Sequence, residues 1–412
     1  MNIIFINYGE SHNNSSHHIH GFALGMAARG HDCVVAVVKS VPQKEMVWRD
    51  GFRIARHRTV LDNGGAFINN RPADVLHLWT PRERVREFAQ SYRERWGACA
   101  MVVHLEDDEE VIFERFTGYD PVALRKEKES SWTHLVVPGL IHPTKHQELL
   151  READAVTLVY HSLDTLLPPG VFHIELPPII DPDFFHSGRR DPLLAQRHGI
   201  TCDDKVIAYN GNDHLANFGD IRLLYAAMDE LMERHHDLFF LRTGIVIAEN
   251  YQGLQFPTGP RYRDLGFVDR SLLPDLMRLS DIFIQSGNMD AFNSHRLPAK
   301  VPEYLSLGRP LIIGRAGIGS ELEDGAAAMV LPHMTVAVIV ERVEWLLAHP
   351  VEAGALGQKG RDFAMNRFAG KKILDDLESL YQQVSAPPTS AHPSSTAGRT
   401  KWRGVASGPP DG

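Results

Sequence analysis

Cysteine is scarce in this sequence, and the few that occur are far apart. Only Cys33, Cys99 and Cys202 are found among 412 residues, and no two of them form a Cys-x-x-Cys pair. A disulfide framework and a structural zinc site are not expected, because both need grouped cysteines. The pattern is typical of a reducing compartment, so we expect a cytoplasmic protein.

Long apolar runs and an excess of positive charge are also missing. No apolar stretch reaches the roughly 18 residues that a membrane helix needs, and residues 1–7 lack the basic start of a signal peptide, so they are interpreted as a first strand. The formal net charge of -9 argues against binding to nucleic acid. The loop after this strand is not Gly-x-Gly-x-x-Gly, so a dinucleotide-binding fingerprint is excluded.

The sequence does contain two series of alternating strand and helix patterns. Short apolar runs typical of buried parallel strands alternate with segments of helical spacing. The expected strands are 3–6, 33–38, 75–79, 100–105, 206–209, 238–242, 281–285 and 310–313, with weaker ones at 135–138 and 155–160. The expected helices are 17–28, 83–96, 220–235, 271–279, 302–307, 336–348 and 370–384. The series predict an α/β protein of two Rossmann-like, doubly wound domains facing a central cleft.

Composition suggests where these domains begin and end. The stretch 168–192 is rich in Pro and Asp and is interpreted as a linker. We expect a first domain over 1–178 and a second over 179–365, with a helix at about 366–384 that packs back on the first. Residues 385–412 are rich in Pro, Ser, Gly and Thr, which predicts a disordered tail.

The segment 285–310 offers the clearest chemistry. A strand is expected to end just before Ser286 and Gly287, two candidate donor-binding residues, and a short helix to begin at Pro302, a residue favoured at the first helical position. Arg296 and Lys300 would add cations to the positive end of this helix, which suits a phosphate group. A carboxylate in its first turn, at 303, could accept hydrogen bonds from a ribose. The alternative is that the carboxylate only complements the helix dipole and that Lys300 is a solvated charge.

The pattern Arg-Leu-Pro-Ala-Lys-x-x-Glu-Tyr-Leu-x-x-Gly-Arg-Pro resembles the donor-binding segment of retaining GT-B glycosyltransferases, the family 4-like group. In that group the glutamate binds the nucleotide ribose, a role that the resemblance implies for Glu303. Weaker similarity covers most of 1–384. It includes 23–35, 266–268 and the glycine loop at 317–321. The resemblance implies the GT-B fold, with an acceptor-binding first domain and a donor-binding second domain.

This sequence departs from the family pattern on the donor side. Where the group often has a second glutamate near the sugar, this chain has His295, and Asp290 or Asn293 remain as alternatives. Where the group carries an Arg and a Lys that grip the diphosphate, the matching stretch Gly211–Asn217 has Asn212 and Asn217. Gly211 and Asn212 stay candidate donor-binding residues. The expected substitutes are Arg242, Arg296 and Lys300.

In the first half, the resemblance places His104 or Glu106 beside the sugar or acceptor, as the catalytic candidates. Gly9 and Trp79 are expected on the acceptor side. A metal site in the acidic run 106–110 is the alternative to a solvated loop, and we expect no metal. The cluster of Ser and His at 15–20 is interpreted mainly as a polar loop and helix start.

The function implied by the resemblance is hexosyl transfer from a nucleoside diphosphate sugar with retention of anomeric configuration. No further cofactor is expected. The acceptor remains open between a saccharide, a lipid-linked glycan, a small metabolite and a protein. Interleaved charges along 83–96 favour a solvated helix, and a weak peripheral membrane contact stays an alternative. Rival interpretations are a GT-B epimerase, a phosphorylase and a non-catalytic binding or partner protein.

Overall fold

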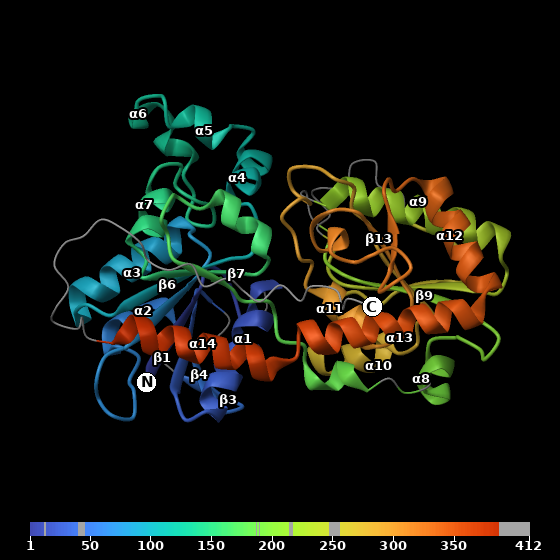
Figure 1. The fold of residues 1–412 in the computed structure, drawn as a ribbon, viewed down its shortest axis with the longest axis horizontal. Coiled ribbons are helices and arrows are strands. Elements are labelled where there is room, and N and C mark those ends of the chain that lie inside the picture. The colour runs from blue at the N-terminus through green and yellow to red at the C-terminus, as the bar shows by residue number, and fades with distance from the viewer. Residues whose placement is uncertain are drawn as a thin grey trace, which may run out of the picture.

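The computed structural model describes residues 1–11, 14–39, 46–186, 188, 190–213, 217–246 and 256–386. Two mainly parallel sheets form the two halves of the molecule, which lie side by side in Figure 1. The predicted disordered tail lies outside the described residues from 387 onward. Within the described ranges, no helix is both long and apolar enough to cross a bilayer.

The first sheet has the strand order β3-β4-β2-β1-β5-β6-β7-β8. Its strands are β1 (Asn2–Asn7), β2 (Asp32–Val37), β3 (Val47–Arg49), β4 (Phe52–Arg56), β5 (Val75–Trp79), β6 (Ala100–Leu105), β7 (Ala155–Leu158) and β8 (His173–Glu175). All neighbours are parallel except β3 and β4. Strands β1, β5 and β6 are buried along their whole length, as their unbroken apolar runs predict.

Helices and 3₁₀ turns surround this sheet. They are α1 (Asn14–Ala28), α2 (His57–Asn63), α3 (Glu83–Trp96), α4 (Glu109–Thr117), α5 (Pro121–Leu124), α6 (Glu129–Trp132), η1 (Thr133–Leu135), α7 (Lys145–Glu152) and η2 (His161–Leu166). The expected strand at 135–138 is wrong. This apolar run follows η1 as irregular backbone that turns at Pro138 and Gly139, and Leu135 and Val137 line a cavity instead of a sheet.

The second sheet has the order β11-β10-β9-β12-β13-β14, all parallel. Its strands are β9 (Lys205–Asn210), β10 (Leu238–Thr243), β11 (Tyr262–Asp264), β12 (Ile282–Gln285), β13 (Leu311–Gly314) and β14 (Met329–Leu331). Counted within this half, the order is 3-2-1-4-5-6, that of a doubly wound dinucleotide-binding fold. The parallel strands of the first half follow the same order, with β8 as a seventh strand at the edge. The strand order therefore reverses between β1 and β5 in one half and between β9 and β12 in the other.

The helices of the second half flank its sheet in the same way. They are η3 (Pro182–Phe185), α8 (Pro192–Arg197), α9 (Phe218–Arg234), η6 (Arg270–Leu272), α10 (Leu273–Met277), α11 (Lys300–Ser306), η7 (Gly317–Ser320), α12 (Val336–Ala348) and α13 (Pro350–Arg367). The stretch interpreted as a linker contains β8, which pairs with β7 of the first sheet, and η3.

The last helix, α14 (Gly370–Ser385), leaves the second half and lies along the first (Figure 1). Tyr381 Oη lies 2.6 Å from Nδ1 of the buried His77, and Arg29, directly after α1, pairs with Asp375 at 2.6 Å. A Cβ at Gly25 would collide with Leu374, so a glycine in α1 permits the close approach of the two helices. The chain thus crosses between the halves twice.

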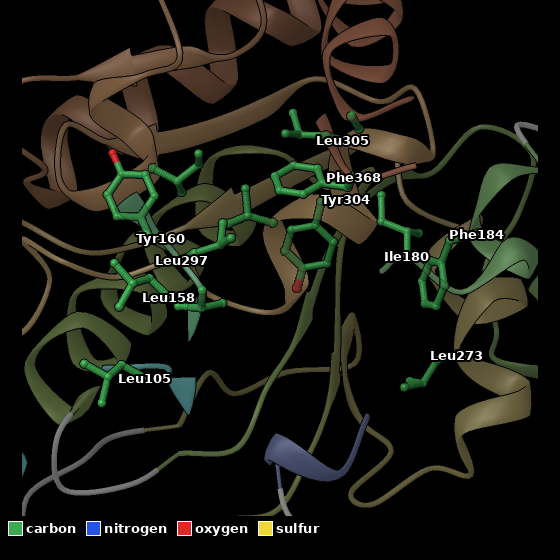
Figure 2. Close-up of a cluster of buried hydrophobic side chains, with 14 of the residues drawn as sticks. Leu105, Leu158, Tyr160, Ile180, Phe184, Leu273, Leu297, Tyr304, Leu305 and Phe368 are labelled. Carbon is green, nitrogen blue, oxygen red and sulfur yellow. The ribbon is translucent and has the colours of Figure 1, made fainter. Parts of the chain in front are cut away.

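A hydrophobic cluster also joins the halves. Figure 2 shows Leu297 of the second half near Leu158 and Tyr160 of the first, and these side chains belong to one buried cluster. The Tyr160 hydroxyl donates to the carbonyl of Gly317 at 3.1 Å. These contacts fix one side of the interface and bring the carboxyl ends of the two sheets together.

Candidate functional site

The loops at the two points of strand reversal face each other across the halves. In an open α/β sheet, ligands bind outside the carboxyl ends of the strands at such points. Across the site, Arg296 Nε lies 3.7 Å from Asp107 Oδ1. Arg296 also lines two cavities, one on each side of it.

The larger cavity, of about 550 Å³, lies mainly in the first half. Its lining residues are Tyr8, Ser15, Arg82, Glu106, Asp107, Ile112, Phe116, Thr117, Leu135, Val137, Gly139, Leu140, Phe292 and Arg296. The smaller cavity, of about 20 Å³, lies in the second half and is lined by Gln285, Ser286, Gly287, Asn293, Arg296, Pro298, Ile313, Gly314 and Ala316. Four of the predicted donor-side and sugar-side residues, at 286, 287, 293 and 296, therefore share one small cavity.

Helix α11 is anchored beneath this region by Tyr304. Its ring stacks on Phe283 with centroids 4.1 Å apart, and its hydroxyl accepts from the Asn210 amide at 2.7 Å. This anchor holds the first turn of α11 against the loop that follows β9. Glu303 in that turn is only 7% exposed and accepts a hydrogen bond from Arg270.

Arg270 is a residue that sequence reasoning missed. It belongs to the short η6, and its guanidinium lies 4.9 Å above the Phe184 ring while it pairs with Glu303. Because an arginine has several donors in a fixed plane, it can orient the carboxylate and keep donors for another partner. The segment 266–268 resembles the family, and this was the only sequence signal near it.

Lys300 lies under the loop after β9. Its Nζ donates to the Tyr209 hydroxyl at 2.9 Å and lies 4.0 Å from the centre of that ring. Burial, and next the positive charge of Arg296, lower the pKa of Lys300 to about 7. A Cβ at Gly211 would collide with Nζ and with the Tyr209 hydroxyl, so glycine at 211 leaves room for this contact.

The structure corrects the prediction for Arg242. This residue is 0% exposed, and its guanidinium pairs with Asp213 at 2.8 Å and Asp264 at 2.9 Å. The same group donates to the carbonyl of Gly244 at 3.1 Å. Arg242 therefore holds the loops that follow β9 and β10 and does not present its charge to the cleft.

Asn212 belongs to the same loop system. Its Oδ1 accepts from the Ile245 amide at 2.8 Å, and its carbonyl accepts from Asn217 Nδ2 at 3.0 Å. The two asparagines that replace the family's cations thus hold backbone in place. A diphosphate contact of Asn212 stays a prediction.

The two alternatives for the sugar-side residue lie in different places. Asn293 is buried, lines the smaller cavity and donates to Asp220 Oδ2 at 3.3 Å. Asp290 is exposed and pairs across the halves with Arg115 at 3.1 Å. Asn293 thus shares the smaller cavity with Ser286 and Gly287, and a sugar contact of either alternative stays a prediction.

On the first half, Glu106 forms a cluster with two residues from the start of α1. Ser15 donates its hydroxyl to Glu106 Oε2, and His18 Nδ1 lies 2.8 Å from Oε1. Burial alone would raise the pKa of Glu106, but the hydrogen bond and charge of His18 outweigh burial and lower it. The serine and histidine cluster, for which the sequence mainly predicts a polar loop and helix start, thus contributes two side chains to the site.

His104 and Trp79 lie behind the larger cavity, not in it. Both are fully buried, and their rings stack with centroids 4.1 Å apart. Burial lowers the pKa of His104 to about 3, so this ring is neutral. The expected contacts of both residues with sugar or acceptor are corrected to a supporting position, because other side chains cover them.

Polar atoms in this layer lack partners among the described residues. They are Trp79 Nε1, Thr80 Oγ1, His104 Nε2 and His18 Nε2, all buried. Thr80 also has a φ of 67°, which is rare for a β-branched residue. Unsatisfied buried groups and backbone strain cluster at functional sites, so both features support a binding site at the ends of β5 and β6.

The acidic run after β6 is paired residue by residue. Asp108 caps α4 by accepting from two amides, Glu109 pairs with Arg82 at 2.8 Å, and Glu110 lies 3.0 Å from His146 Nε2. Burial raises the pKa of Asp107 to about 7, although Arg296 opposes this shift. In the part of the chain that the structure describes, no group of three or more His, Cys, Asp or Glu could hold a metal ion.

Gly9 follows β1 at the edge of the site. Its carbonyl accepts from the Val38 amide at 2.9 Å, and its amide donates to Asn7 Oδ1 at 3.0 Å. A close approach of substrate to Gly9 stays a prediction.

The fold resembles that of known glycosyltransferase structures. Sucrose-phosphate synthase from Thermosynechococcus elongatus aligns with a TM-score of 0.69 and 14% identity over 93% of this chain and 99% of that chain. HepE of Anabaena in complex with UDP-glucose aligns at 0.68 and 12% identity, over 93% and 100%. The UDP-forming trehalose-phosphate synthase from Burkholderia xenovorans aligns at 0.63 and 13%, over 94% and 99%.

These alignments show that the chain has the GT-B fold. By sequence, it matches no protein-family model and no curated protein.

Proposed function

We propose that this protein is a glycosyltransferase that moves a hexosyl group from a nucleoside diphosphate sugar to an acceptor. The observation that carries the proposal is the arrangement of Glu303, Lys300 and Arg296 at the strand reversal of the second half. Of these three side chains, Arg296 also lines the larger cavity of the first half. Similar structures that contain UDP or UDP-glucose support the nucleotide assignment.

In this proposal the second half, 179–365, binds the donor. Glu303 accepts hydrogen bonds from the ribose, and Arg270 keeps its carboxylate oriented. Lys300 and Arg296 lie close enough for the charge of Arg296 to lower the pKa of Lys300, so a diphosphate between them would relieve their repulsion. Ser286 and Asn293 face the sugar from the smaller cavity.

The first half, 1–178, binds the acceptor and completes the reaction. The bond between the anomeric carbon and the diphosphate breaks while the two cations stabilise the leaving group. The acceptor hydroxyl then attacks from the same face, and its proton passes to the leaving phosphate oxygen, so configuration is retained. Glu106, fixed by Ser15 and His18, positions the sugar or acceptor. No metal ion or other cofactor enters this scheme.

We place the protein in the cytoplasm as part of the same proposal. Three free cysteines are consistent with the reducing cytoplasm. A weak peripheral contact with a membrane is compatible with the proposed reaction and would bring a lipid-linked acceptor to the cavity.

The donor test uses UDP and UDP-glucose. We expect calorimetry to show binding of both and Glu303→Ala to weaken it by about 1.5–3 kcal/mol, the range for hydrogen bonds to a charged group. A matched control is Glu341→Ala, because Glu341 is an exposed residue of α12. An unchanged dissociation constant in Glu303→Ala would refute the ribose contact.

A panel of nucleoside diphosphate sugars tests the reaction itself. Release of nucleoside diphosphate that depends on an added acceptor supports transfer. A second candidate function is a non-catalytic nucleotide-binding protein, which the structural engagement of Asn212 and Arg242 favours. Binding without turnover on the whole panel would support that candidate, and epimerised sugar without an acceptor would indicate an epimerase.

A further inference from the structure

The larger cavity has two kinds of wall. One wall is polar and contains Tyr8, Ser15, Arg82, Glu106, Asp107 and Arg296. The other is apolar and contains Ile112, Phe116, Leu135, Val137, Leu140 and Phe292. The apolar wall comes mainly from α4, the last residue of η1 and the segment after it. Figure 1 shows α4 on the side of the first half that faces the second.

The apolar wall leaves large side chains open to the cavity. Phe116 is 56% exposed and Val137 is 46% exposed, and both line the same space. A single exposed apolar residue is ordinary, but two that line one concave surface point to a ligand. Covering such side chains contributes about 25 cal/mol for each Å² of apolar surface removed from water.

The charged side chains of the polar wall are already paired with other groups of the protein. Arg82 pairs with Glu109 at 2.8 Å, and Arg296 lies 3.7 Å from Asp107. Glu106 is held by Ser15 and His18. Every charged side chain in the lining thus has a partner of opposite charge or a hydrogen-bonding histidine. An anionic acceptor at Arg82 would have to displace Glu109 and would lie beside the carboxylate of Glu106, whereas a neutral hydroxyl can add to these hydrogen bonds.

We propose that the acceptor is an uncharged hydroxyl compound that carries an apolar group of about the size of a phenyl or hexyl chain. Its hydroxyl lies on the polar wall near Arg296, because Arg296 also borders the smaller, donor-side cavity. Its apolar group lies against Phe116 and Val137. The cavity of about 550 Å³ falls in the range of pockets for such ligands. This inference rests on the proposed transferase function.

Matched neutral glucosides test the apolar wall directly by binding. Calorimetry on the full chain, with UDP present, compares methyl, hexyl and phenyl β-glucoside, which differ only in the apolar group. We expect hexyl and phenyl glucoside to bind at least about tenfold more tightly than methyl glucoside, since each buried methylene contributes about 0.8 kcal/mol. Equal affinities, or no binding of any of the three, would overturn the proposal.

Variants of exposed residues locate the effect. Phe116→Ala and Val137→Ser should each reduce the preference for the hexyl group by about three- to tenfold. Neither change is expected to unfold the protein, because both side chains are largely exposed. Leu193→Ala is the matched control, an exposed apolar residue of α8 outside the cavity. A preference that survives both variants, or falls equally in the control, would contradict the proposed wall.

Two further experiments test whether the acceptor is lipid-borne or free, and whether it is neutral or anionic. Binding of hexyl glucoside in solution is required for either source of the acceptor. If the protein also co-sediments with phosphatidylcholine vesicles that carry dodecyl glucoside, and not with plain vesicles, a lipid-borne acceptor is supported; hexyl glucoside binding alone supports a free one. Tighter binding of glucose 6-phosphate than of hexyl glucoside would overturn it. UDP binding is measured separately, so its loss would refute the donor site, whereas intact UDP binding without a hexyl preference refutes only this inference.

Discussion

The two halves of the molecule share one strand order but end their central strands with different side chains. In the second half, the reversal point is surrounded by Lys300, Arg296 and Arg270. In the first half, the equivalent place holds Glu106, supported by Ser15 and His18, and an apolar wall. A repeated scaffold can therefore bind an anionic donor on one side and a neutral acceptor on the other, because function depends on the loops and not on the sheet.

Within the second half, charged residues also differ in whether a carboxylate of the protein already neutralises them. Arg242 is paired on both sides beneath the loops, whereas Lys300 has a hydroxyl and a ring as partners. The first arrangement stabilises the fold, and the second leaves a cation that gains from an added anion.

The largest effect is expected for Arg242→Met. The change leaves the buried Asp213 without its partner, and breaking such a pair typically costs about 3–5 kcal/mol. Chemical denaturation followed by circular dichroism should show this loss. The control is Arg222→Met, an exposed residue of α9. A stable Arg242→Met protein that loses only UDP binding would restore the original prediction of a diphosphate contact.

Glu106→Gln should lower the rate of transfer without changing the affinity for UDP. We expect the rate of transfer to fall about 100-fold, in the range for a group that positions reacting atoms, while the Kd for UDP changes less than about twofold. The reason is that Glu106 lines the first-half cavity and not the donor-side one. The measurement is kcat with saturating UDP-glucose, beside calorimetry with UDP. A large change in UDP affinity would show that the two cavities do not act separately.

Lys300→Met should have the opposite signature. The Kd for UDP is expected to rise about 10- to 100-fold, the loss of a charge-assisted hydrogen bond. The melting temperature should stay unchanged or rise, because the pKa of Lys300 near 7 shows that the fold disfavours its charge. Lys372→Met, at an exposed position of α14, is the control. Unaltered UDP binding would remove Lys300 from the donor site.

The smallest effect is a pH dependence of donor binding. Since a diphosphate beside Lys300 raises the pKa of the amine, the affinity for UDP-glucose should be full below pH 7 and fall as pH rises above it, by up to about tenfold per unit. Calorimetry between pH 6.5 and about 8.5, in buffers of different ionisation enthalpy, should detect proton uptake.

Two variants decide the origin of this pH dependence. Lys300→Arg keeps its charge over the whole range and should abolish the slope. Asp107→Asn should preserve the slope, although the pKa of Asp107 also lies near 7. A slope that follows Asp107 would move the titrating group to the acceptor side.

Much of the fold could be predicted from sequence because parallel strands buried on both faces are unbroken apolar runs. Strands β1, β6 and β9 were predicted to within a residue or two. Strand β11 was missed because its three residues are polar and partly exposed. That omission also explains the error at Arg242, since its partner Asp264 ends β11. The prediction for His104 was wrong because the sequence does not show to which face of the sheet a residue near a strand end points. Its ring faces the interior, where it contacts Thr157 of β7.

The sequence by itself determined the two doubly wound halves, the short helix that carries Glu303 and the resemblance to a donor-binding segment. These are local properties, set by apolar periodicity and by one continuous motif. Only the tertiary structure decided which charges are free to act, because pairing depends on residues far apart in the chain. It buried Arg242 between two aspartates and brought Arg270 to Glu303. It also placed a Ser and a His of α1 on Glu106, beside an apolar wall formed by α4, the segment after η1 and Phe292.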